Sequence, residues 1–412
     1  MRNCTIFTLS NGIRVVHQHI PSTNIVHCGL FLGIGSRDEN TLNQGIAHFW
    51  EHMAFKGTRR RTSLDIIKSL DSIGGELNAF TDKEKIVFYA SVRDRYFERA
   101  VDVLTDITFQ STFPTKELEK ERGVILEEMA MYDDSPDDAI QDELESVIFN
   151  NHPMGMNILG NETTVRAFRK RDFVSFFSNH ADNRKIVFSV IGNVSLEAVE
   201  QIVIKYLERK PTLRSTARRK RFGAYHQHEK IVQKGAKQSR CAIGRDAYPL
   251  LSEKRIPFYL MNNILGGPGM NSRLNLSVRE KHGLVYSIDS HYHAYSDTGM
   301  FAIYFGTEPK QVKKCMSLIR REMDKLCTTR LSPSELASAK DQIKGQLALS
   351  EENNLGLMIM MGRAVLDQDR VPALNELFEK IDHVTSRELQ TVANEIFEED
   401  KLSFLYMEPV AK

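Results

Sequence analysis

Short segments along the N-terminal half of the chain carry two patterns of apolar and polar positions. Some segments have the pattern of strands, and others have the period of helices. Apolar or alternating runs predict strands at 5–9, 13–17, 25–33, 85–92 and 185–191, with Ser-Asn-Gly between the first two as in a β-hairpin. Helical periodicity predicts helices at 45–55, 63–73, 95–110, 115–132 and 196–207. Thr62 or Ser63 is expected to cap the second helix. This half is therefore predicted to be α+β.

The same order of elements recurs in the C-terminal half. Pro114 opens a long helix after a strand and a helix, and Pro333 does the same after the strand predicted at 299–307. We therefore predict an α+β fold of two structurally repeated domains, each a mostly antiparallel sheet packed with helices. The predicted bounds are 1–208 for the first domain, 209–225 for a basic linker and 226–412 for the second domain.

The predicted linker carries seven Lys and Arg residues and no acid. Such a run is typical of a solvated linker or of a nucleic-acid patch. The linker is favoured because the run is short and no aromatic-rich sheet accompanies it. Arg59-Arg60-Arg61 has the same two interpretations. Over the whole chain, 55 Lys and Arg balance 54 Asp and Glu, so we expect no nucleic-acid partner.

Composition narrows the class of protein. The chain has 412 residues, of which 41% are hydrophobic, and this excludes wholesale disorder and disulfide scaffolds. Its five cysteines form no C-x-x-C pair, which predicts reduced thiols. No N-terminal apolar signal and no stretch of about 18 apolar residues is found, so we expect a cytoplasmic protein without a membrane partner.

The sharpest chemical pattern is His48-Phe49-Trp50-Glu51-His52, an H-x-x-E-H sequence in a predicted helix. On a helix His48 and His52 share one face, and their imidazoles can take two corners of a tetrahedral zinc site. Glu51 leans to the same side and can take a proton from water that zinc acidifies. This order of residues is the inverzincin form of zinc protease. The alternative is two packing histidines and a surface Glu. Phe49 and Trp50 are core residues under both interpretations.

A catalytic zinc site needs a third protein ligand, which spacing alone cannot choose. In the helix at 115–132, Glu121 and Glu128 lie beside an apolar stripe, seven residues apart on one side. A carboxylate at a buried edge is costly unless a cation or hydrogen bonds offset it. Glu127 is expected to face solvent. Periodicity leaves both interpretations of Glu121 and Glu128 open, as metal-site groups or as ordinary surface carboxylates.

Longer stretches in both halves carry a family resemblance. They are GIAHFWEHMAFKGT (45–58), GGELNAFTDKEKIVFYASV (74–92), ERGVILEEM (121–129), HPMGMNILGNETTV (152–165) and NSRLNLSVREKHGLVYSI (271–288). Together they resemble the M16 metallopeptidases, the group of pitrilysin, insulin-degrading enzyme and mitochondrial processing peptidase. The resemblance implies that His48, His52 and Glu128 bind one Zn²⁺ per chain, with Glu51 as catalytic base. It implies Glu121 as a carboxylate that orients a ligand.

The resemblance also implies substrate contacts. The strand at Asn78-Ala79-Phe80-Thr81 would bind the peptide backbone as an added β-strand. Arg279 and Tyr286 would contact the substrate and help to hold the tetrahedral intermediate. The alternative for this last pair is a structural Arg and a core Tyr.

Only the first repeat carries the metal pattern. FYLMNNILGG (258–267) stands where the first repeat has HFWEHMAFKG, and it contains no His. With Pro114 aligned to Pro333, Glu121 falls opposite Lys340 and Glu128 opposite Leu347. The second repeat is therefore expected to be a scaffold that supplies substrate contacts.

We thus predict a zinc-dependent endopeptidase that cleaves short or unfolded peptides in an enclosed chamber. Family chambers contain four such domains and this chain has two, so the resemblance implies a homodimer or a heterodimer with a related subunit. One alternative is a catalytically inactive, peptide-binding chamber subunit, and another is a metal hydrolase for a small molecule. The peptide substrate stays open, as does the metal, since His₂Glu sites also accept manganese and cobalt.

Overall fold

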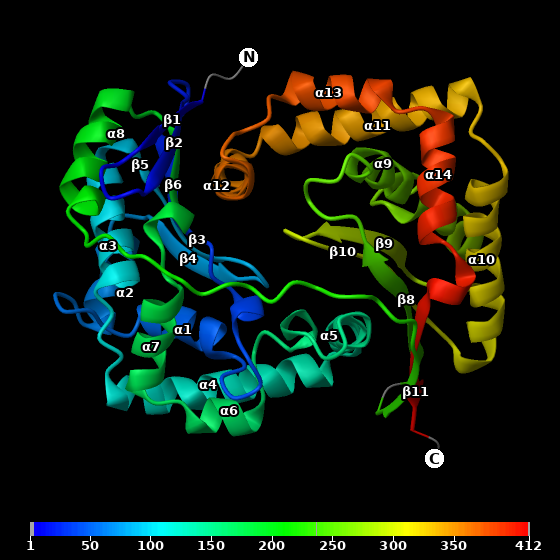
Figure 1. Ribbon diagram of the computed structural model, residues 1–412, viewed down its shortest axis with the longest axis horizontal. Helices are drawn as coiled ribbons and strands as arrows, with labels where there is room; N and C mark the ends of the chain where they lie inside the picture. The colour runs from blue at the N-terminus through cyan, green and yellow to red at the C-terminus, as the bar shows by residue number, and fades with distance from the viewer. Residues whose placement is uncertain (1–3, 236, 411–412) are drawn as a thin grey trace. The chain divides into compact units, whose positions relative to one another are not determined.

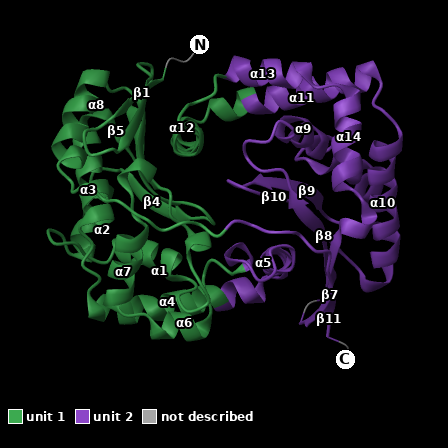
Figure 2. Ribbon diagram, in the orientation of Figure 1, with its two compact units in different colours: residues 1–129, 156–220, 348–373 green, residues 130–155, 221–347, 374–412 purple. Residues whose placement is uncertain are grey.

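Each of the two units of the fold combines segments from both halves of the chain. The computed structural model describes residues 4–235 and 237–410. Unit 1 comprises residues 1–129, 156–220 and 348–373, and unit 2 comprises residues 130–155, 221–347 and 374–412 (Figure 2). The second half of the chain thus supplies one segment of unit 1, and the first half supplies one segment of unit 2. The domain bounds predicted from the sequence stay predictions.

Unit 1 contains a six-stranded sheet in the order β1-β2-β6-β3-β5-β4. Only β2 and β6 pair in parallel, and the other neighbours are antiparallel. β4 lies at the edge, with β5 as its one neighbour in the sheet. The strands are β1 (Thr5–Thr8), β2 (Arg14–His19), β3 (Ile25–Leu32), β4 (Glu76–Thr81), β5 (Ile86–Arg93) and β6 (Ile186–Gly192).

Helices cover both faces of this sheet (Figure 1). Strand residues such as Phe88 and Phe188 share a core with α1, α3 and α7, whereas Phe31 and Val187 on the opposite face pack with α12. Because both faces are buried here, the central strands β3, β5 and β6 are apolar over most of their length. The helices are α1 (Ile46–Ala54), α2 (Ser63–Asp71), α3 (Phe97–Phe109), α4 (Thr115–Asp134), α6 (Glu162–Ala167), α7 (Lys170–His180), α8 (Leu196–Val203) and α12 (Asn354–Gln368).

Unit 2 repeats this plan with one strand fewer. Its sheet has the order β7-β11-β8-β10-β9, with β7 and β11 parallel and the other pairs antiparallel. Its strands are β7 (Glu229–Lys234), β8 (Ser239–Ala247), β9 (Ile288–Ala294), β10 (Gly299–Thr307) and β11 (Ser403–Pro409). Its helices are α5 (Pro136–Ile148), α9 (Arg255–Gly266), α10 (Val312–Thr328), α11 (Pro333–Glu351), α13 (Leu374–His383) and α14 (Ser386–Ile396). The predicted α+β fold of two repeated, mostly antiparallel units is confirmed.

Short helical turns complete the chain. They are η1 (Ser36–Asp38), η2 (Asp94–Tyr96), η3 (Pro153–Gly155), η4 (Asn183–Lys185), η5 (Ile204–Glu208), η6 (Asn275–Glu280), η7 (Pro309–Gln311) and η8 (Glu399–Lys401). Thr62 caps α2 as predicted, since its Oγ1 accepts the backbone N–H of Asp65. All five cysteines are free thiols, also as predicted. None of the described helices combines the length and the apolar character that crossing a membrane requires.

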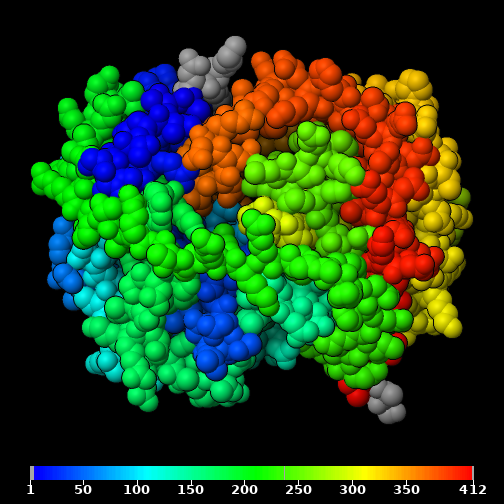
Figure 3. Space-filling model, viewed as in Figure 1, coloured from blue at the N-terminus to red at the C-terminus, as the bar shows by residue number. Residues whose placement is uncertain are grey.

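The two basic segments are engaged with acidic side chains of unit 1. Arg60 and Arg61 form ion pairs with Asp102 and Asp106 on α3. Residues 209–220 contain no helix or strand, and most of them lie at the surface (Figure 3). Within this segment Arg219 pairs with Asp38 through two bonds of 2.9 Å. These contacts favour a structural role over a nucleic-acid patch.

Candidate metal centre

Helix α1 presents His48, Glu51 and His52 because its apolar side is fixed in the core of unit 1. Phe49 and Trp50 are buried as predicted, and Trp50 stacks on Phe177 with ring centroids 5.2 Å apart. The helix begins after Gly45, whose φ of 91° is accessible to glycine at little cost. A side chain at Gly45 would also meet the backbone of Gly160. The start of the helix is therefore closely determined.

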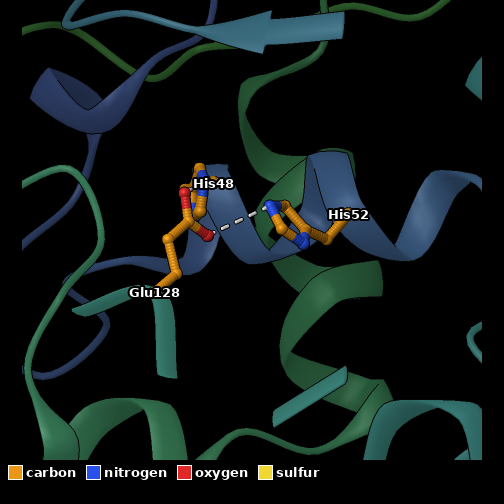
Figure 4. A group of neighbouring side chains, drawn as sticks. All are labelled: His48, His52 and Glu128. Carbon is orange, nitrogen blue, oxygen red and sulfur yellow. Dashed lines mark ion pairs between the residues drawn. The ribbon is translucent and has the colours of Figure 1, made fainter. Parts of the chain in front are cut away.

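The carboxylate of Glu128, from α4, lies between the two imidazoles of α1 (Figure 4). Its oxygens are 3.7 Å from Nε2 of His48 and 3.6 Å from Nε2 of His52. One ligand atom from each of these three residues lies within 4.8 Å of the others. Among residues 4–235 and 237–410 no second such set of three His, Cys, Asp or Glu side chains occurs. The described residues of unit 2 thus contain no such set.

These three residues fit a zinc ion. Zinc bonds of about 2.0–2.1 Å place tetrahedral ligand atoms about 3.3–3.4 Å apart, close to the separations observed here. The observed distances of 3.6 and 3.7 Å between the Nε2 atoms and the carboxylate oxygens are too long for hydrogen bonds. The two imidazoles and the carboxylate therefore face one another without bonding directly. Two imidazoles and one carboxylate are also the donor set of many catalytic zinc sites. The geometry and the chemistry of the donors therefore both fit a zinc site.

Burial prepares His48 as a neutral ligand. Burial, reinforced by the charge of His52, lowers the pKa of His48 to about 3. The imidazole is therefore uncharged at neutral pH, the form that binds metals. Its Nδ1 is buried, and no described residue offers it a hydrogen bond. Burial also raises the pKa of Glu128, against the influence of His52. A cation between these groups would offset the cost of burying the carboxylate.

Glu121 orients His52. Its Oε1 accepts a hydrogen bond from Nδ1 of His52 at 2.9 Å, and its Oε2 pairs with Nζ of Lys56 at 2.6 Å. Burial opposes ionisation of Glu121, but the bonds from His52 and Lys56 outweigh it and lower the pKa of the carboxyl. With Nδ1 engaged in this way, Nε2 of His52 is directed at Glu128. This is the usual way in which a carboxylate fixes the tautomer of a metal-binding histidine.

Glu51 is held by the neighbouring edge strand. The hydroxyl of Thr81, at the end of β4, donates to Oε2 of Glu51 at 2.7 Å. Burial raises the pKa of Glu51, although the hydrogen bond from Thr81 and the charge of His52 oppose the rise. A buried carboxylate beside two imidazoles and an open strand edge can transfer protons.

Comparison with known proteins agrees with this geometry. Residues 14–162 match the model of insulinase, peptidase family M16, and residues 167–343 match that of the peptidase M16 inactive domain. An uncharacterised zinc protease of Bacillus subtilis is 34% identical over 394 residues, which cover 96% of each chain. The chain belongs to peptidase family M16. A second relative, an uncharacterised zinc protease of Streptomyces coelicolor, is 33% identical over 94% of this chain and 86% of its own.

Solved structures show the same fold as this M16 chain. The crystal structure of a peptidase M16 inactive domain from Pseudomonas fluorescens superposes with a TM-score of 0.92 at 18% identity, covering 99% of this chain and 98% of the other. A protease from Helicobacter pylori gives a TM-score of 0.88 at 20% identity, covering 99% and 100%. The repeated α+β architecture therefore occurs in both of these solved structures at low sequence identity.

The other predicted site residues of the M16 chain lie in both units. Asn78, Ala79, Phe80 and Thr81 all lie on the edge strand β4. Tyr286 lies in unit 2 with 89% of its surface exposed, which disfavours the alternative of a core Tyr. Arg279 lies in η6 of unit 2, where its Nη1 donates to Asn275 at 3.4 Å. The substrate roles of these residues stay predictions.

Two further residues, Lys56 and Glu39, support the site of the M16 chain and are not among the residues predicted from the sequence. Lys56 follows His52 by four residues, as His52 follows His48, so helical spacing in the sequence could have placed it on the same face. Glu39 is buried, and its carboxylate accepts the backbone N–H groups of Gly45 and Ala47 at 2.8 Å each, which caps α1. No spacing rule connects Glu39 to the helix, because the intervening residues form an irregular loop.

Proposed function

We propose that this chain is a zinc endopeptidase that cleaves short or unfolded peptides. The observation that carries the proposal is the convergence of His48, His52 and Glu128, with Glu51 on the same helix and hydrogen-bonded to the edge strand β4. Metal ligands, a proton-transfer group and an open strand edge are the parts that hydrolysis of an extended peptide needs. The names of the two relatives, both zinc proteases, support this assignment.

Each residue has a defined task in this proposal. His48, His52 and Glu128 would hold one zinc ion, and zinc bound there would supply the Lewis acidity that polarises a carbonyl and acidifies water. Glu51 takes a proton from the attacking water and passes it to the leaving amine. Because Thr81 engages Oε2 of Glu51, Oε1 is the atom that carries the proton. Glu121 keeps His52 in the orientation that metal binding requires.

The peptide would bind along β4. An edge strand has unpaired backbone groups on its outer side, and an extended peptide can pair with them whatever its side chains. Asn78, Ala79, Phe80 and Thr81 would supply these contacts. Arg279 and Tyr286 would contact the substrate and stabilise the oxyanion. Main-chain recognition explains a preference for short or unfolded substrates, since a folded protein offers no free extended segment.

The resemblance to M16 enzymes further supports a chamber formed by two chains. With two domains per chain, a homodimer or a heterodimer with a related subunit would supply the four domains of a family chamber. The mass of the purified protein, measured by light scattering, tests this assembly. A monomeric mass for a fully active enzyme would contradict it.

Cleavage with and without a metal chelator tests the function. An unfolded protein and its folded form are each incubated with zinc-loaded enzyme, and the fragments are identified by mass spectrometry. We expect cleavage of the unfolded form alone, loss of cleavage with chelator, and recovery when zinc is returned. The Glu51→Gln variant should keep its zinc and lose about 10²–10⁴-fold in kcat, the usual contribution of a positioned general base.

Three outcomes would contradict the proposal. Full zinc content with no cleavage of any unfolded peptide would favour the inactive, peptide-binding subunit. Wild-type turnover by Glu51→Gln would show that Glu51 is not the base. Hydrolysis of a small-molecule ester without peptide cleavage would favour the small-molecule hydrolase.

A further inference from the structure

The turn that joins the edge strand β4 to β5 consists of four charged residues, Asp82-Lys83-Glu84-Lys85. We call residues 82–85 the charged turn. Oδ1 of Asp82 accepts the backbone N–H groups of Glu84 and Lys85 at 2.8 and 2.7 Å, which closes the turn on itself. Lys83, Glu84 and Lys85 are nevertheless buried, between 3% and 8% exposed. Charged residues at a hairpin turn are ordinarily solvated, so their burial requires an explanation.

Every side chain of the charged turn contacts a residue that is distant in sequence, and the four partners come from three different segments. The contacts are Asp82 with Arg363 at 3.2 Å, Lys83 with the carbonyl of Met156 at 2.8 Å, Glu84 with Arg37 at 2.7 Å, and Lys85 with Asp367 at 3.1 Å. Two of the partners, Arg363 and Asp367, lie on α12, which reaches unit 1 from the second half of the chain. All of these residues belong to unit 1.

The basic linker adds a fifth anchor. Nη2 of Arg219 donates to the carbonyl of Glu84 at 2.7 Å and to the carbonyl of Gly33 at 3.0 Å. The same guanidinium pairs with Asp38 at 2.9 Å. Arg219 therefore joins the charged turn to the end of β3. The function proposed above does not account for this basic residue.

The charged turn determines where β4 ends. β4 has a strand neighbour on one side only, and such an edge strand opens locally more easily than a central strand. Thr81, the last residue of β4, directly precedes the turn and bonds to Glu51. The anchors thus act on the strand at the end that lies beside the proposed catalytic base.

We propose that Arg363, Asp367 and Arg219 are positioning residues that hold β4 in the place where a peptide can pair with it. This inference rests on the proposed function of β4 as the substrate strand. It assigns a task to α12 and to the linker, neither of which carries a proposed catalytic group. Loosening an anchor should weaken peptide binding and leave the metal site filled.

Neutralising Asp367 tests the inference. The Asp367→Asn variant keeps the shape of the side chain and removes the charge that pairs with Lys85. Its matched control is Asp102→Asn, which removes the charge that pairs with Arg60 and Arg61 in unit 1. The two carboxylates have similar exposure, 19% for Asp102 and 22% for Asp367. Hydrogen–deuterium exchange of the zinc-loaded proteins reports on β4 without reference to activity. Peptide kinetics and zinc content are measured on the same samples.

We expect backbone amides of β4 and β5 to exchange about tenfold faster in Asp367→Asn, the order of change that loss of one charged contact produces. KM for an unfolded peptide should rise severalfold, with a smaller change in kcat and unchanged zinc, because uniform substrate binding is lost. The control should leave exchange in β4 and KM as in the wild type. Exchanging the two charges, with Lys85→Asp and Asp367→Lys together, should restore both readouts.

Unchanged exchange in β4 of Asp367→Asn would overturn the inference, whatever the activity. Faster exchange with an unchanged KM would overturn the link between the anchors and the substrate. If the zinc-loaded wild type cleaves no peptide, the proposed function fails. The exchange data then still decide whether α12 fixes the strand.

Discussion

Replacing Glu121 with Gln separates the orientation of a metal ligand from metal binding itself. Glu121 is 5% exposed, and it bonds to Nδ1 of His52 at 2.9 Å and to Lys56 at 2.6 Å. Gln has the same shape but no charge, and one of its two ends presents N–H groups. It therefore cannot accept hydrogen bonds from both Nδ1–H of His52 and the ammonium of Lys56. Nε2 of His52 would then no longer be fixed toward Glu128.

The expected loss is about 10–100-fold in zinc affinity, the usual effect of removing a partner that orients a metal ligand. This corresponds to about 1.4–2.8 kcal/mol, since each tenfold change in affinity is about 1.4 kcal/mol. The range agrees with the net value of about 1.5–3 kcal/mol for a hydrogen bond to a charged group. Removing a ligand should cost more, because the metal then loses a direct bond.

The zinc affinity is measured by competition of the metal-free protein with a chromogenic chelator. Glu127→Gln is the matched control, since Glu127 is exposed on the same helix and carries the same charge. Thermal unfolding of the metal-free proteins shows whether each variant is folded before zinc is added. If folded Glu121→Gln binds zinc as tightly as the wild type and Glu127→Gln do, Glu121 does not orient His52 for metal binding.

Three further predictions concern the same unit. Glu128→Ala should lose zinc while α1 stays folded, and a normal zinc content measured by atomic emission would remove Glu128 from the ligand set. Trp50→Ala should lower the free energy of unfolding by about 3–5 kcal/mol, because a fully packed ring is removed. Urea titration measures this free energy. A loss below about 1 kcal/mol would contradict the packing of Trp50 in the core. The hydrogen bond with Arg184 lowers the pKa of Asp182 from an ordinary 3.8 to about 2. Ionised Asp182 therefore stabilises the fold above its ordinary pKa, and this stabilisation is lost as the pH falls through 2. The stability difference between the wild type and Asp182→Asn should therefore be constant from pH 7 to about 5 and shrink between about 4 and 2; a difference independent of pH would refute the assignment.

Local pattern was sufficient for the part of the site that lies on one helix. His48, Glu51 and His52 share a face because residues three and four apart on a helix do so in any protein. The burial of Phe49 and Trp50 and the cap at Thr62 follow from similarly short-range rules. Periodicity also selected Glu121 and Glu128 as a pair beside a buried stripe.

The difference between Glu121 and Glu128 was not accessible to such rules. Both lie on one side of α4, yet Glu121 contacts Nδ1 of His52 whereas Glu128 faces Nε2. Which nitrogen each carboxylate meets depends on the packing of α4 against α1, and these helices are separated by about 60 residues of chain. Family resemblance proposed the two roles, and the folded backbone supplies their geometry.

The kinds of element, the repeat and the helical half of the metal site follow from the order of neighbouring residues, so local pattern is enough to predict them. Long-range packing is what places α12 in unit 1 and brings Arg363 and Asp367 to a turn about 280 residues earlier in the chain. The physical reason is that these contacts form between charged groups whose spacing along the chain follows no period, and only packing of the sheet brings them together.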